Sequence, residues 1–368
     1  MQISVLDPIQ QTIIFTAFLL AAIFFTSKKN SNGYQIQHSH TNELKGLAIL
    51  MIIFSHAGYF LSTDHRFLYP LSTAGGVGVN VFLFLSGFGL TMSSLKSNYS
   101  ILGFYKKRLP KIFIPMWIVV SIFLILSFFV LGKNYPSDTL IQSFLGFFPK
   151  ADIYTSLNSP LWYFSLILFY YLIFPLVFWK KIPLLSVFLT VLVGVFFTNL
   201  ALPVDKDVLK LYKLHDLAFP LGMGFAIFLK DATKMRLVRY LFRPLSLVQQ
   251  KVKILKAFLT LFLIAISGFT IINSGVGEGM VKEQFISLVT VLLLATASLL
   301  KKFQSKFLIL LGIYSYEIYL IQWPLVLHYD LFYQYFPASI ATILYLSFYL
   351  ALGFCLKKLT QSLFLKKL

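Results

Sequence analysis

The sequence predicts an all-α integral membrane protein with about eleven transmembrane helices, and three observations support this. Hydrophobic residues make up 58% of the 368-residue chain and charged residues only 12%, whereas about a quarter of a soluble domain is charged. The 40 Phe and 20 Tyr suit lipid-facing and interfacial positions. The basic residues fall between apolar runs, so the net charge of +19 indicates topology and contact with anionic membrane lipids, with no nucleic-acid partner.

Eleven apolar runs approach the roughly 20 residues that a helix needs to cross a bilayer. No basic residues precede the first run, and Lys28 and Lys29 follow it. It is therefore predicted to remain as a membrane anchor and not to be a cleaved signal peptide. The run at 285–300 is short for a span. The predicted spans are 9–27, 43–61, 75–95, 110–131, 160–179, 182–201, 212–230, 254–273, 285–300, 307–328 and 336–356.

The loops between these spans alternate in charge. One side carries 25 of the 32 basic residues and the other carries seven, and basic loops face the cytoplasm. The predicted protein is a multi-pass cell-membrane protein with its N-terminus outside and its C-terminus cytoplasmic. The outer loop at 202–213 fits least well because it holds three lysines. The long basic loop at about 231–253 is predicted to form an amphipathic helix on the cytoplasmic membrane surface.

Several kinds of site are excluded. Cys355 is the single cysteine, so the chain has no internal disulfide and no multi-cysteine metal site. The sequence contains no P-loop and no dinucleotide-binding fingerprint. No metal is expected.

Lys45 and His56 frame the second run, which reads NELKGLAILMIIFSH. Eleven residues of helix span about 16 Å, so Lys45 lies at the cytoplasmic boundary and His56 in the outer half of the membrane. Ionisable groups at this depth are costly and indicate function by default. A neutral imidazole suits proton transfer at neutral pH. The structural alternative is a histidine that hydrogen-bonds to another helix.

Other polar residues also lie in apolar runs or at their ends. Glu317 lies in the middle of a span and is a functional candidate, or a protonated group that hydrogen-bonds to another helix. His215, Asp216 and His328 lie near span ends, where water is close, and are interpreted as structural. In the glycine-rich run GGVGVNVFLFLSGFGL, Asn80 is expected to orient the imidazole of His56. The glycines of this run permit either a close ligand or ordinary helix packing.

Two stretches have both a functional and a structural interpretation. Lys106, Lys107, Arg108 and Lys111 lie at the cytoplasmic mouth of the fourth span, in FYKKRLPKIFIPMW. Such a cluster binds polyanionic phosphate or anionic lipid. Trp162 and Tyr163 lie near the outer interface, where an aromatic belt is the structural interpretation.

Taken in order, these stretches resemble the acyltransferase 3 family of integral-membrane acyltransferases. The family has a basic residue eleven positions before a histidine, a glycine-rich helix ending in SGF, a basic FYxRR-type segment, an LW…YL..PL helix and a late SYxxYLxH-like segment. Order and spacing hold over about residues 42–326. The corresponding residues here are Lys45-Gly46-Leu47-Ala48 through His56, Gly78-Val79-Asn80 through Ser86-Gly87-Phe88, Phe104 through Arg108, Leu161-Trp162 through Pro175, and Ser315 through Gln322.

The resemblance also implies a domain organisation. The family core has ten helices, so residues 1–41 form an extra N-terminal transmembrane helix with a basic cytoplasmic linker. Residues 42–368 form the membrane acyltransferase domain. Three positions depart from the family pattern, since lysine replaces the usual arginine at 45, Asn80 stands where many members carry aspartate, and Gln322 replaces a frequent histidine. An amide can hold an imidazole but cannot stabilise imidazolium by charge.

The resemblance implies polysaccharide modification in the cell envelope, by transfer of an acyl group, usually acetyl, from acetyl-CoA to a hydroxyl of a cell-surface or lipid-linked glycan. His56 is then the catalytic residue, either as general base or as a transient acyl-histidine. Trp162 and Tyr163 would stack on the sugar. The residues expected to bind the donor are Lys45, Lys106, Lys107, Arg108 and Lys111, and those expected near the acceptor are Asn80, Ser86, Trp162, Tyr163 and Glu317.

Two other classes of function stay open on the sequence. A transporter or flippase of polysaccharide intermediates would use polar groups at the membrane midplane differently, and no paired repeat with broken helices is evident. A structural or assembly subunit of an envelope complex would tolerate substitution of His56. The acceptor, the acyl group and the oligomeric state do not follow from the sequence.

Overall fold

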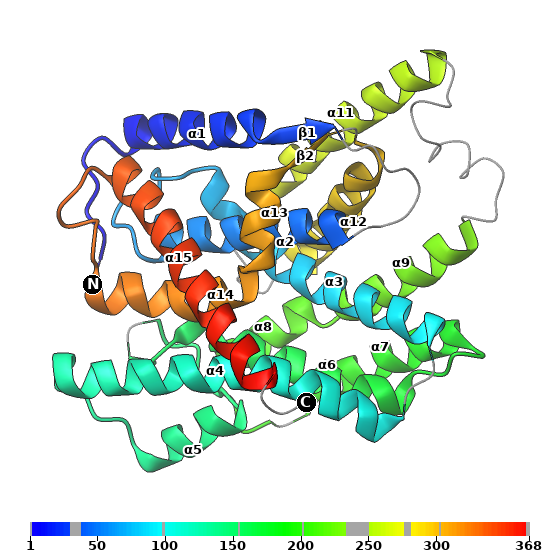
Figure 1. The fold of residues 1–368 in the computed structure, drawn as a ribbon, viewed down its shortest axis with the longest axis horizontal. Coiled ribbons are helices and arrows are strands. Elements are labelled where there is room, and N and C mark those ends of the chain that lie inside the picture. Colours follow the sequence, from blue (N-terminus) through cyan, green and yellow to red (C-terminus); the bar gives the residue numbers. More distant parts are fainter. Residues whose placement is uncertain are drawn as a thin grey trace.

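The apolar runs fold into helices, and the prediction of an all-α membrane protein is confirmed. A computed structural model describes residues 2–29, 38–97, 100–153, 155–200, 202–232, 250–275, 281–301 and 303–365, and within these ranges the strands are limited to two short ones (Figure 1). The elements are α1 (Pro8–Phe25), β1 (Ser27–Lys29), α2 (His38–Ser55), the π-helical turn η1 (His56–Phe60), the 3-10 turn η2 (Leu71–Ala74), α3 (Gly75–Lys96), α4 (Ile101–Leu131), α5 (Ser137–Leu145), the 3-10 turn η3 (Ser159–Leu161), α6 (Trp162–Val177), α7 (Pro183–Asn199), α8 (Lys206–His215), α9 (Ala218–Ala232), α11 (Gln250–Ile272), α12 (Val281–Leu300), β2 (Phe303–Ser305), α13 (Lys306–Ile313), α14 (Ser315–Pro324), the π-helical turn η5 (Leu325–Tyr329) and α15 (Ala338–Leu365).

Nine of the eleven predicted spans correspond to membrane-length elements. Among the described residues, eight helices are long and apolar enough to cross a membrane, and α13 with α14 and η5 supplies a ninth span that bends by 73°. The predicted run at 182–201 is α7, which is apolar but has only 17 residues. The stretch predicted as an interfacial helix, 231–253, lies largely outside the described residues.

The predicted span at 212–230 is wrong as a single helix, because the chain breaks between α8 and α9. α8 is amphipathic: Val208 and Tyr212 are buried, whereas Lys206, Lys210 and Lys213 are exposed. A helix with one charged face lies across the end of a bundle more readily than through a bilayer. The three lysines that fitted the outer loop poorly are therefore the exposed face of α8.

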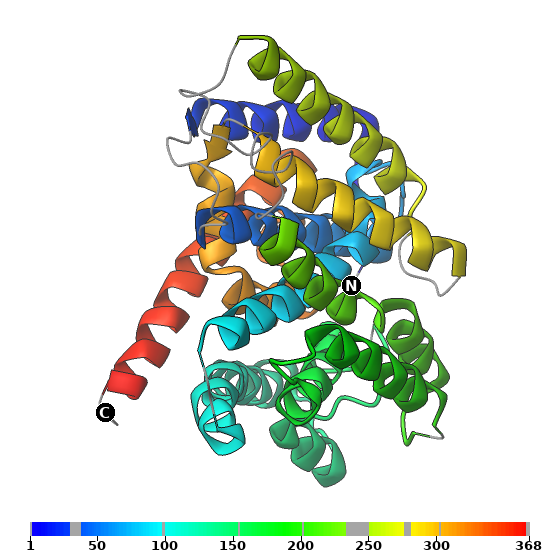
Figure 2. The same cartoon turned by 90° about the vertical axis from the view of Figure 1, so that its right-hand side faces the viewer.

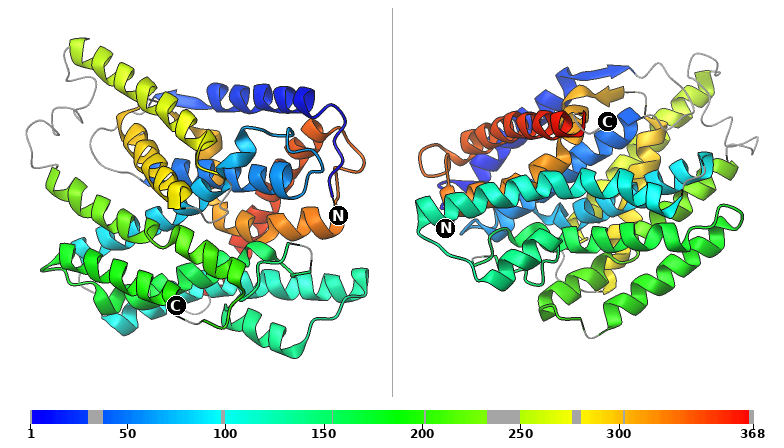
Figure 3. Two further views of the ribbon diagram at one scale, coloured as in Figure 1. Left: turned by 180° about the vertical axis from the view of Figure 1, so that it is seen from behind. Right: turned by 60° about the horizontal axis from the view of Figure 1, so that its bottom comes forward.

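The two largest of the four hydrophobic clusters among the described residues, here called the two cores, divide most of the bundle. The first joins α1, α2, α4, α14 and α15, and the second joins α3, α6, α8 and α9. Figure 2 shows α1, α2 and α12 in one half of the molecule and α4 to α7 in the other. In Figure 3 α4 runs alongside α6, so α4 connects the two halves.

Glycines set the closest helix contacts. A Cβ atom on Gly46 of α2 would lie 1.9 Å from the carbonyl oxygen of Leu308, and one on Gly312 would lie 1.7 Å from that of Asn42. The backbones of α2 and α13 therefore touch, which any larger side chain would prevent. Gly87, in the SGF segment of α3, packs in the same way on Phe219 of α9. Of the two interpretations of the glycine-rich run, helix packing therefore accounts for Gly87.

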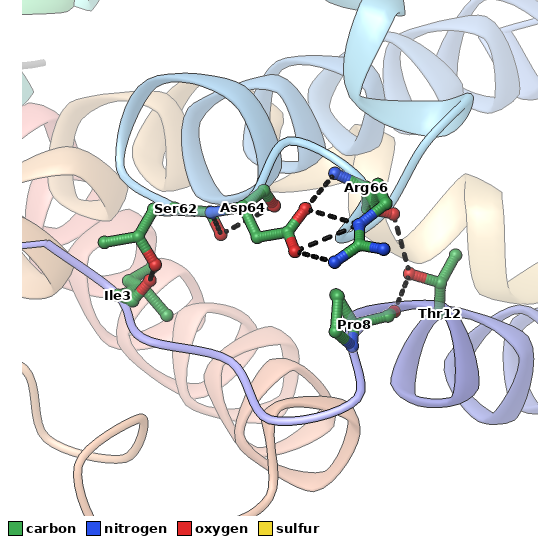
Figure 4. Close-up of polar contacts among 7 residues, drawn as sticks. Ile3, Pro8, Thr12, Ser62, Asp64 and Arg66 are labelled. Atoms are coloured by element: carbon green, nitrogen blue, oxygen red, sulfur yellow. Dashed lines mark hydrogen bonds and ion pairs between the residues drawn. The ribbon is translucent and has the colours of Figure 1, made fainter.

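The N-terminal segment packs firmly on the rest of the chain. Phe15 of α1 is fully buried and meets Phe54 of α2 edge to face, with ring centroids 5.2 Å apart. At the end of the bundle that we call the loop end, residues 2–7 run beside residues 61–70, and the Thr12 hydroxyl accepts from the backbone N–H of Leu68 at 2.7 Å. In Figure 4 the Asp64 carboxylate faces the Arg66 guanidinium. Hydrogen bonds from Arg66 lower the pKa of Asp64 to about 2.

Contacts between loops agree with the predicted alternation of sides. At the loop end, the Ile3 N–H donates to the Leu61 carbonyl at 2.7 Å, so two predicted outer segments meet. At the opposite end, which we call the strand end, β1 pairs antiparallel with β2. There Lys301 forms an ion pair with the buried Glu43 at 2.6 Å. Both contacts at the strand end join segments that the charge pattern predicts to be cytoplasmic.

Candidate functional site

His56 lies where α2 changes from an α-helix into the π-helical turn η1. π-helical turns interrupt the regular ladder and occur frequently at functional sites. The imidazole Nδ1 lies 3.0 Å from Oε1 and 2.8 Å from Nε2 of the Gln322 amide. When Oε1 accepts the bond, Nδ1 carries the proton and Nε2 holds a free lone pair. The amide of Gln322 lies within hydrogen-bond distance of Nδ1 through either atom, and the arrangement in which Oε1 accepts holds the tautomer of His56 that can take a proton.

α14 brings Gln322 and its neighbour Trp323 to His56, and like α2 it continues directly into a π-helical turn, η5. The Trp323 ring meets the imidazole edge to face at a centroid distance of 4.7 Å. The Tyr349 hydroxyl donates to the Gln322 carbonyl at 3.1 Å. Gln322 is 2% exposed, so its side chain has few alternative partners and His56 is held in place.

A cavity of about 380 Å³ opens beside His56. It lies between the two cores, because Trp323 belongs to the first and Trp162 to the second. The Ser55–His56 end of α2 forms one wall, and the predicted Trp162 contributes to another. The lining residues are Ile52, Ser55, His56, Phe60, Gly75, Gly76, Val79, Ala151, Ile153, Ser159, Pro160, Trp162, Asp207, Lys210, Leu211, His215 and Trp323.

The expectation that Asn80 orients His56 is wrong, because Asn80 holds a second histidine of the same cavity. Its Oδ1 lies 2.7 Å from Nδ1 of His215, and its Nδ2 donates to the Ser287 hydroxyl at 2.7 Å. With Nδ2 of Asn80 donating to Ser287, Oδ1 faces His215 and accepts from its Nδ1–H. Trp162 stacks on the His215 ring at 5.5 Å and 18°. Each cavity histidine therefore has its Nδ1 paired with an uncharged side-chain amide, which leaves Nε2 for a ligand.

The prediction that His215 lies near water at the end of a span is wrong. The residue is 1% exposed, because the break after α8 folds the chain back into the bundle. The next residue, Asp216, fixes this break: its carboxylate accepts from Gln284 at 3.0 Å and from Thr198 at 3.3 Å. The Tyr170 hydroxyl donates to the Asp216 carbonyl. These contacts hold the end of α8 against α6, α7 and α12.

A second polar cluster forms at the strand end. Lys45 on α2 is close enough to Arg108, Lys357 and Glu317 to interact with their charges. These four residues come from α2, α4, α15 and α14. Glu317 is 7% exposed and does not line the cavity. Its helix turns it toward the cations, which balance a buried carboxylate, and its place beside the acceptor stays a prediction.

The other predicted residues divide between exposed positions and the bundle interior. Lys106, Lys107 and Lys111 are exposed, so of the four cations on α4 only Arg108 reaches Lys45. Ser86 interacts with Tyr171, whose hydroxyl also lies near Arg108. Ser86 therefore belongs to the strand-end cluster and not to the cavity.

Half-buried tyrosines and the buried Tyr319 lie between the two clusters. Tyr163, which was expected to contact an acceptor, instead packs edge to face on Tyr319 at 5.5 Å and does not line the cavity. Tyr316 interacts with Tyr171 and Tyr163. The Tyr319 hydroxyl donates to the carbonyl of Pro160, a lining residue, at 2.6 Å. The tyrosines thus follow one another from Arg108 toward the cavity.

Three residues of this site, Ser55, Gln322 and Trp323, were not predicted from the sequence. Gln322 was recognised as a departure from a motif, but its contact with His56 joins residues 266 positions apart. Ser55 and Trp323 looked like ordinary members of apolar runs. Within the described residues, no group of three His, Cys, Asp or Glu side chains is placed to hold a metal ion.

The helical bundle and its cavity define a multi-pass membrane protein with two cavity histidines, one half-buried and one buried, and a cation cluster near the opposite end. The comparisons with known proteins then place the chain: a family described as an acyltransferase domain, acyltransferase 3, matches residues 42–357, and the chain belongs to this family. The match covers α2 to most of α15 and leaves α1 outside.

Two curated proteins are similar over part of the chain. The acyltransferase MdmB of Streptomyces mycarofaciens is 31% identical over 131 residues, which are 32% of this chain and 32% of that protein. The O-acetyl transferase of Shigella phage Sf6 is 27% identical over 133 residues, 32% of this chain and 38% of that protein. The chain thus spans about a third of the length of these relatives. No solved structure matches it.

Proposed function

We propose that this protein is a membrane-bound O-acyltransferase that moves an acetyl group from acetyl-CoA to a hydroxyl of a glycan. The observation that carries the proposal is the arrangement on α2, with Lys45 in a cation cluster at its start and His56 beside a cavity at its end. Family membership over residues 42–357 supports the reaction class. The names of the two relatives, an acyltransferase and an O-acetyl transferase, agree with it.

The strand end binds the donor in this proposal. Lys45, Arg108 and Lys357 are cations from three helices, and such a group matches the phosphates of acetyl-CoA, with Arg108 able to bind in bidentate fashion. The strand end then faces the cytoplasm, where acetyl-CoA is made, as the basic loops also predict. The thioester arm extends along the tyrosines between the two clusters, toward His56, about 16 Å further along α2.

His56 acts as the general base. Its Nε2 takes the proton of the acceptor hydroxyl as that oxygen attacks the thioester carbonyl. Collapse of the tetrahedral intermediate breaks the carbon–sulfur bond, and the imidazolium returns the proton to the leaving sulfur. Gln322 keeps Nδ1 protonated throughout, so the lone pair stays on the nitrogen that faces the substrate.

The acceptor occupies the cavity between the two histidines. Trp162 offers an apolar ring face, and Nε2 of His215 offers a hydrogen-bond acceptor for a second hydroxyl. A sugar has hydroxyls on its edge and apolar faces, so it suits these two surfaces together. Asp207 and Lys210 of α8 lie at the same cavity. The acceptor is therefore a glycan, at the cell surface or linked to lipid, and enters from the loop end.

His56→Ala tests the proposal. The purified protein, returned to lipid nanodiscs, is incubated with radiolabelled acetyl-CoA and membranes of the producing cells, and label in the glycan fraction is counted. We expect the rate of acetyl transfer to fall about 10²–10⁴-fold, which is the contribution of general base catalysis. The temperature of thermal unfolding should not change. Lys106→Ala, at an exposed position of α4, is the control. Substantial transfer by His56→Ala would refute the assignment.

A further inference from the structure

Two hydrogen-bond donors beside His56 have no partner. Among the residues that the structure describes, the Ser55 hydroxyl and the Trp323 indole N–H are buried side-chain groups without a hydrogen bond. Each residue is 1% exposed, and each lines the cavity. Buried polar groups are normally paired, so an exception requires an explanation, such as a role in catalysis or an unplaced ligand.

Other residues of this chain show what such groups do when their role is structural. The Thr12 hydroxyl, on α1, donates to the carbonyl of Pro8 four residues earlier at 2.7 Å. The Trp117 indole N–H donates to the Phe144 carbonyl at 2.7 Å. Ser55 has the helical carbonyl of Met51 available in the same way, yet it makes no such bond. Both donors beside His56 therefore lack the partner that such groups have elsewhere in the described chain.

The two donors are adjacent to the catalytic pair in sequence. Ser55 precedes His56 at the end of α2, and Trp323 follows Gln322 on α14. The hydrogen bond between His56 and Gln322 therefore fixes the backbone of both donors at once. The 4.7 Å ring contact places the Trp323 indole directly against the imidazole. The two donors therefore flank the pair of His56 and Gln322, one on α2 and one on α14.

We propose that Ser55 Oγ–H and Trp323 Nε1–H form the oxyanion hole of the acyl transfer, and this rests on the proposed function. As the acceptor oxygen bonds to the thioester carbon, the carbonyl electron pair moves onto its oxygen, and the acceptor proton goes to Nε2 of His56. The two donors bind that negative oxygen. When the carbonyl re-forms, the carbon–sulfur bond breaks and the sulfur takes the proton from the imidazolium.

The same site serves either route of transfer. If His56 attacked the thioester itself, the carbonyl oxygen would carry the same charge in the same place, so the donors would act on both intermediates. Preorganised donors aimed at a developing oxyanion, in a site without bulk water, are often the largest contribution to catalysis. The neutral partners Gln322 and Asn80 provide no charge for this purpose, whereas the two donors are next to His56 and Gln322 in sequence.

The test uses Ser55→Ala and Trp323→Phe in full-length protein in nanodiscs. Each change removes one donor and keeps most of the side-chain shape. We expect kcat to fall about 10²–10³-fold for each, with the KM for acetyl-CoA within about threefold of wild type. Ser298→Ala removes another buried hydroxyl without a partner, on α12 and away from the cavity, and should leave kcat unchanged.

The outcomes separate this inference from the proposed function. If wild type is active and His56→Ala is inactive, but both donor variants keep kcat within threefold, the oxyanion hole is wrong and the proposed function stands. A rise in KM with normal kcat would also overturn the inference, because it shows ground-state binding. If His56→Ala retains transfer, both ideas fail. Should Trp323→Phe misfold by thermal unfolding, Ser55→Ala, which removes a single oxygen, decides the matter.

Discussion

Replacing Gln322 tests how the His56 tautomer is set. Gln322→Leu keeps the approximate volume of the side chain and removes the amide that contacts Nδ1 at 3.0 and 2.8 Å. The imidazole then loses its buried partner, and its proton is free to move to Nε2, the nitrogen that must act as base. A tyrosine anchors the Gln322 backbone through its carbonyl, so the helix itself should stay in place.

The magnitude follows from the contact that is lost. A donor left unsatisfied in a buried site costs about 1–3 kcal/mol, and Gln322 is 2% exposed. If that cost appears in the transition state, kcat falls roughly 10- to 100-fold, at 1.36 kcal/mol for each factor of ten. The whole general-base contribution of about 10²–10⁴ is the upper limit.

The assay measures kcat and KM for acetyl-CoA across pH 5–9 with the protein in nanodiscs. Gln322→Glu provides the matched variant, since a carboxylate still accepts from Nδ1–H and favours the same tautomer. We expect Gln322→Leu to be slow at every pH, and Gln322→Glu to keep measurable activity with its optimum moved to higher pH, because the carboxylate favours imidazolium. Wild-type kcat in Gln322→Leu would refute the reasoning.

Three further predictions address other parts of the molecule. Arg108→Ala should raise the KM for acetyl-CoA about tenfold, and Lys106→Ala should not, because only Arg108 reaches Lys45; equal effects in acceptor and donor titrations would argue against phosphate binding. His215→Gln should raise the acceptor concentration for half-maximal transfer about tenfold and leave acetyl-CoA binding by calorimetry unchanged; unchanged acceptor dependence would exclude His215 from the acceptor site. Because Arg66 lowers the pKa of Asp64 to about 2, the stabilisation from this pair is complete above the unfolded carboxyl value of about 3.9 and is lost only as pH falls through about 2. Hydrogen exchange of residues 61–69 should therefore be equally protected at pH 7 and pH 4 after correction for intrinsic rates, and faster in Asp64→Asn; protection that is already lost at pH 4 would contradict this pKa.

The sequence was most informative about segments that act alone. An apolar run of about 20 residues forms a helix in a membrane because its backbone groups bond within the run, so nine of the eleven runs matched membrane-length elements. α8 could not be predicted in this way, because it mixes apolar and charged residues and its hydropathy does not distinguish a span from a surface helix. Only the packing of Val208 and Tyr212 turns it across the bundle.

For the site, the sequence predicted the residues whose signal is local and missed those that depend on distant partners. A histidine in an apolar run is unusual in itself, so His56 was identified, and the cavity contains it together with Trp162. Asn80 was assigned to the nearer histidine, whereas its partner is His215, 135 positions away. Glu317 was recognised as costly, but its cations, Lys45 and Lys357, come from two other helices.

The sequence by itself determined that the chain is an all-α membrane protein and which family it resembles, and it predicted which loops share a side. These properties depend on composition and on the order of short motifs, which a linear reading preserves. Tertiary structure alone decided which amide holds which imidazole, that two histidines share one cavity, and that Ser55 and Trp323 lack partners there. The physical reason is that a hydrogen bond requires two groups within about 3 Å, and helix packing, not sequence spacing, sets that distance.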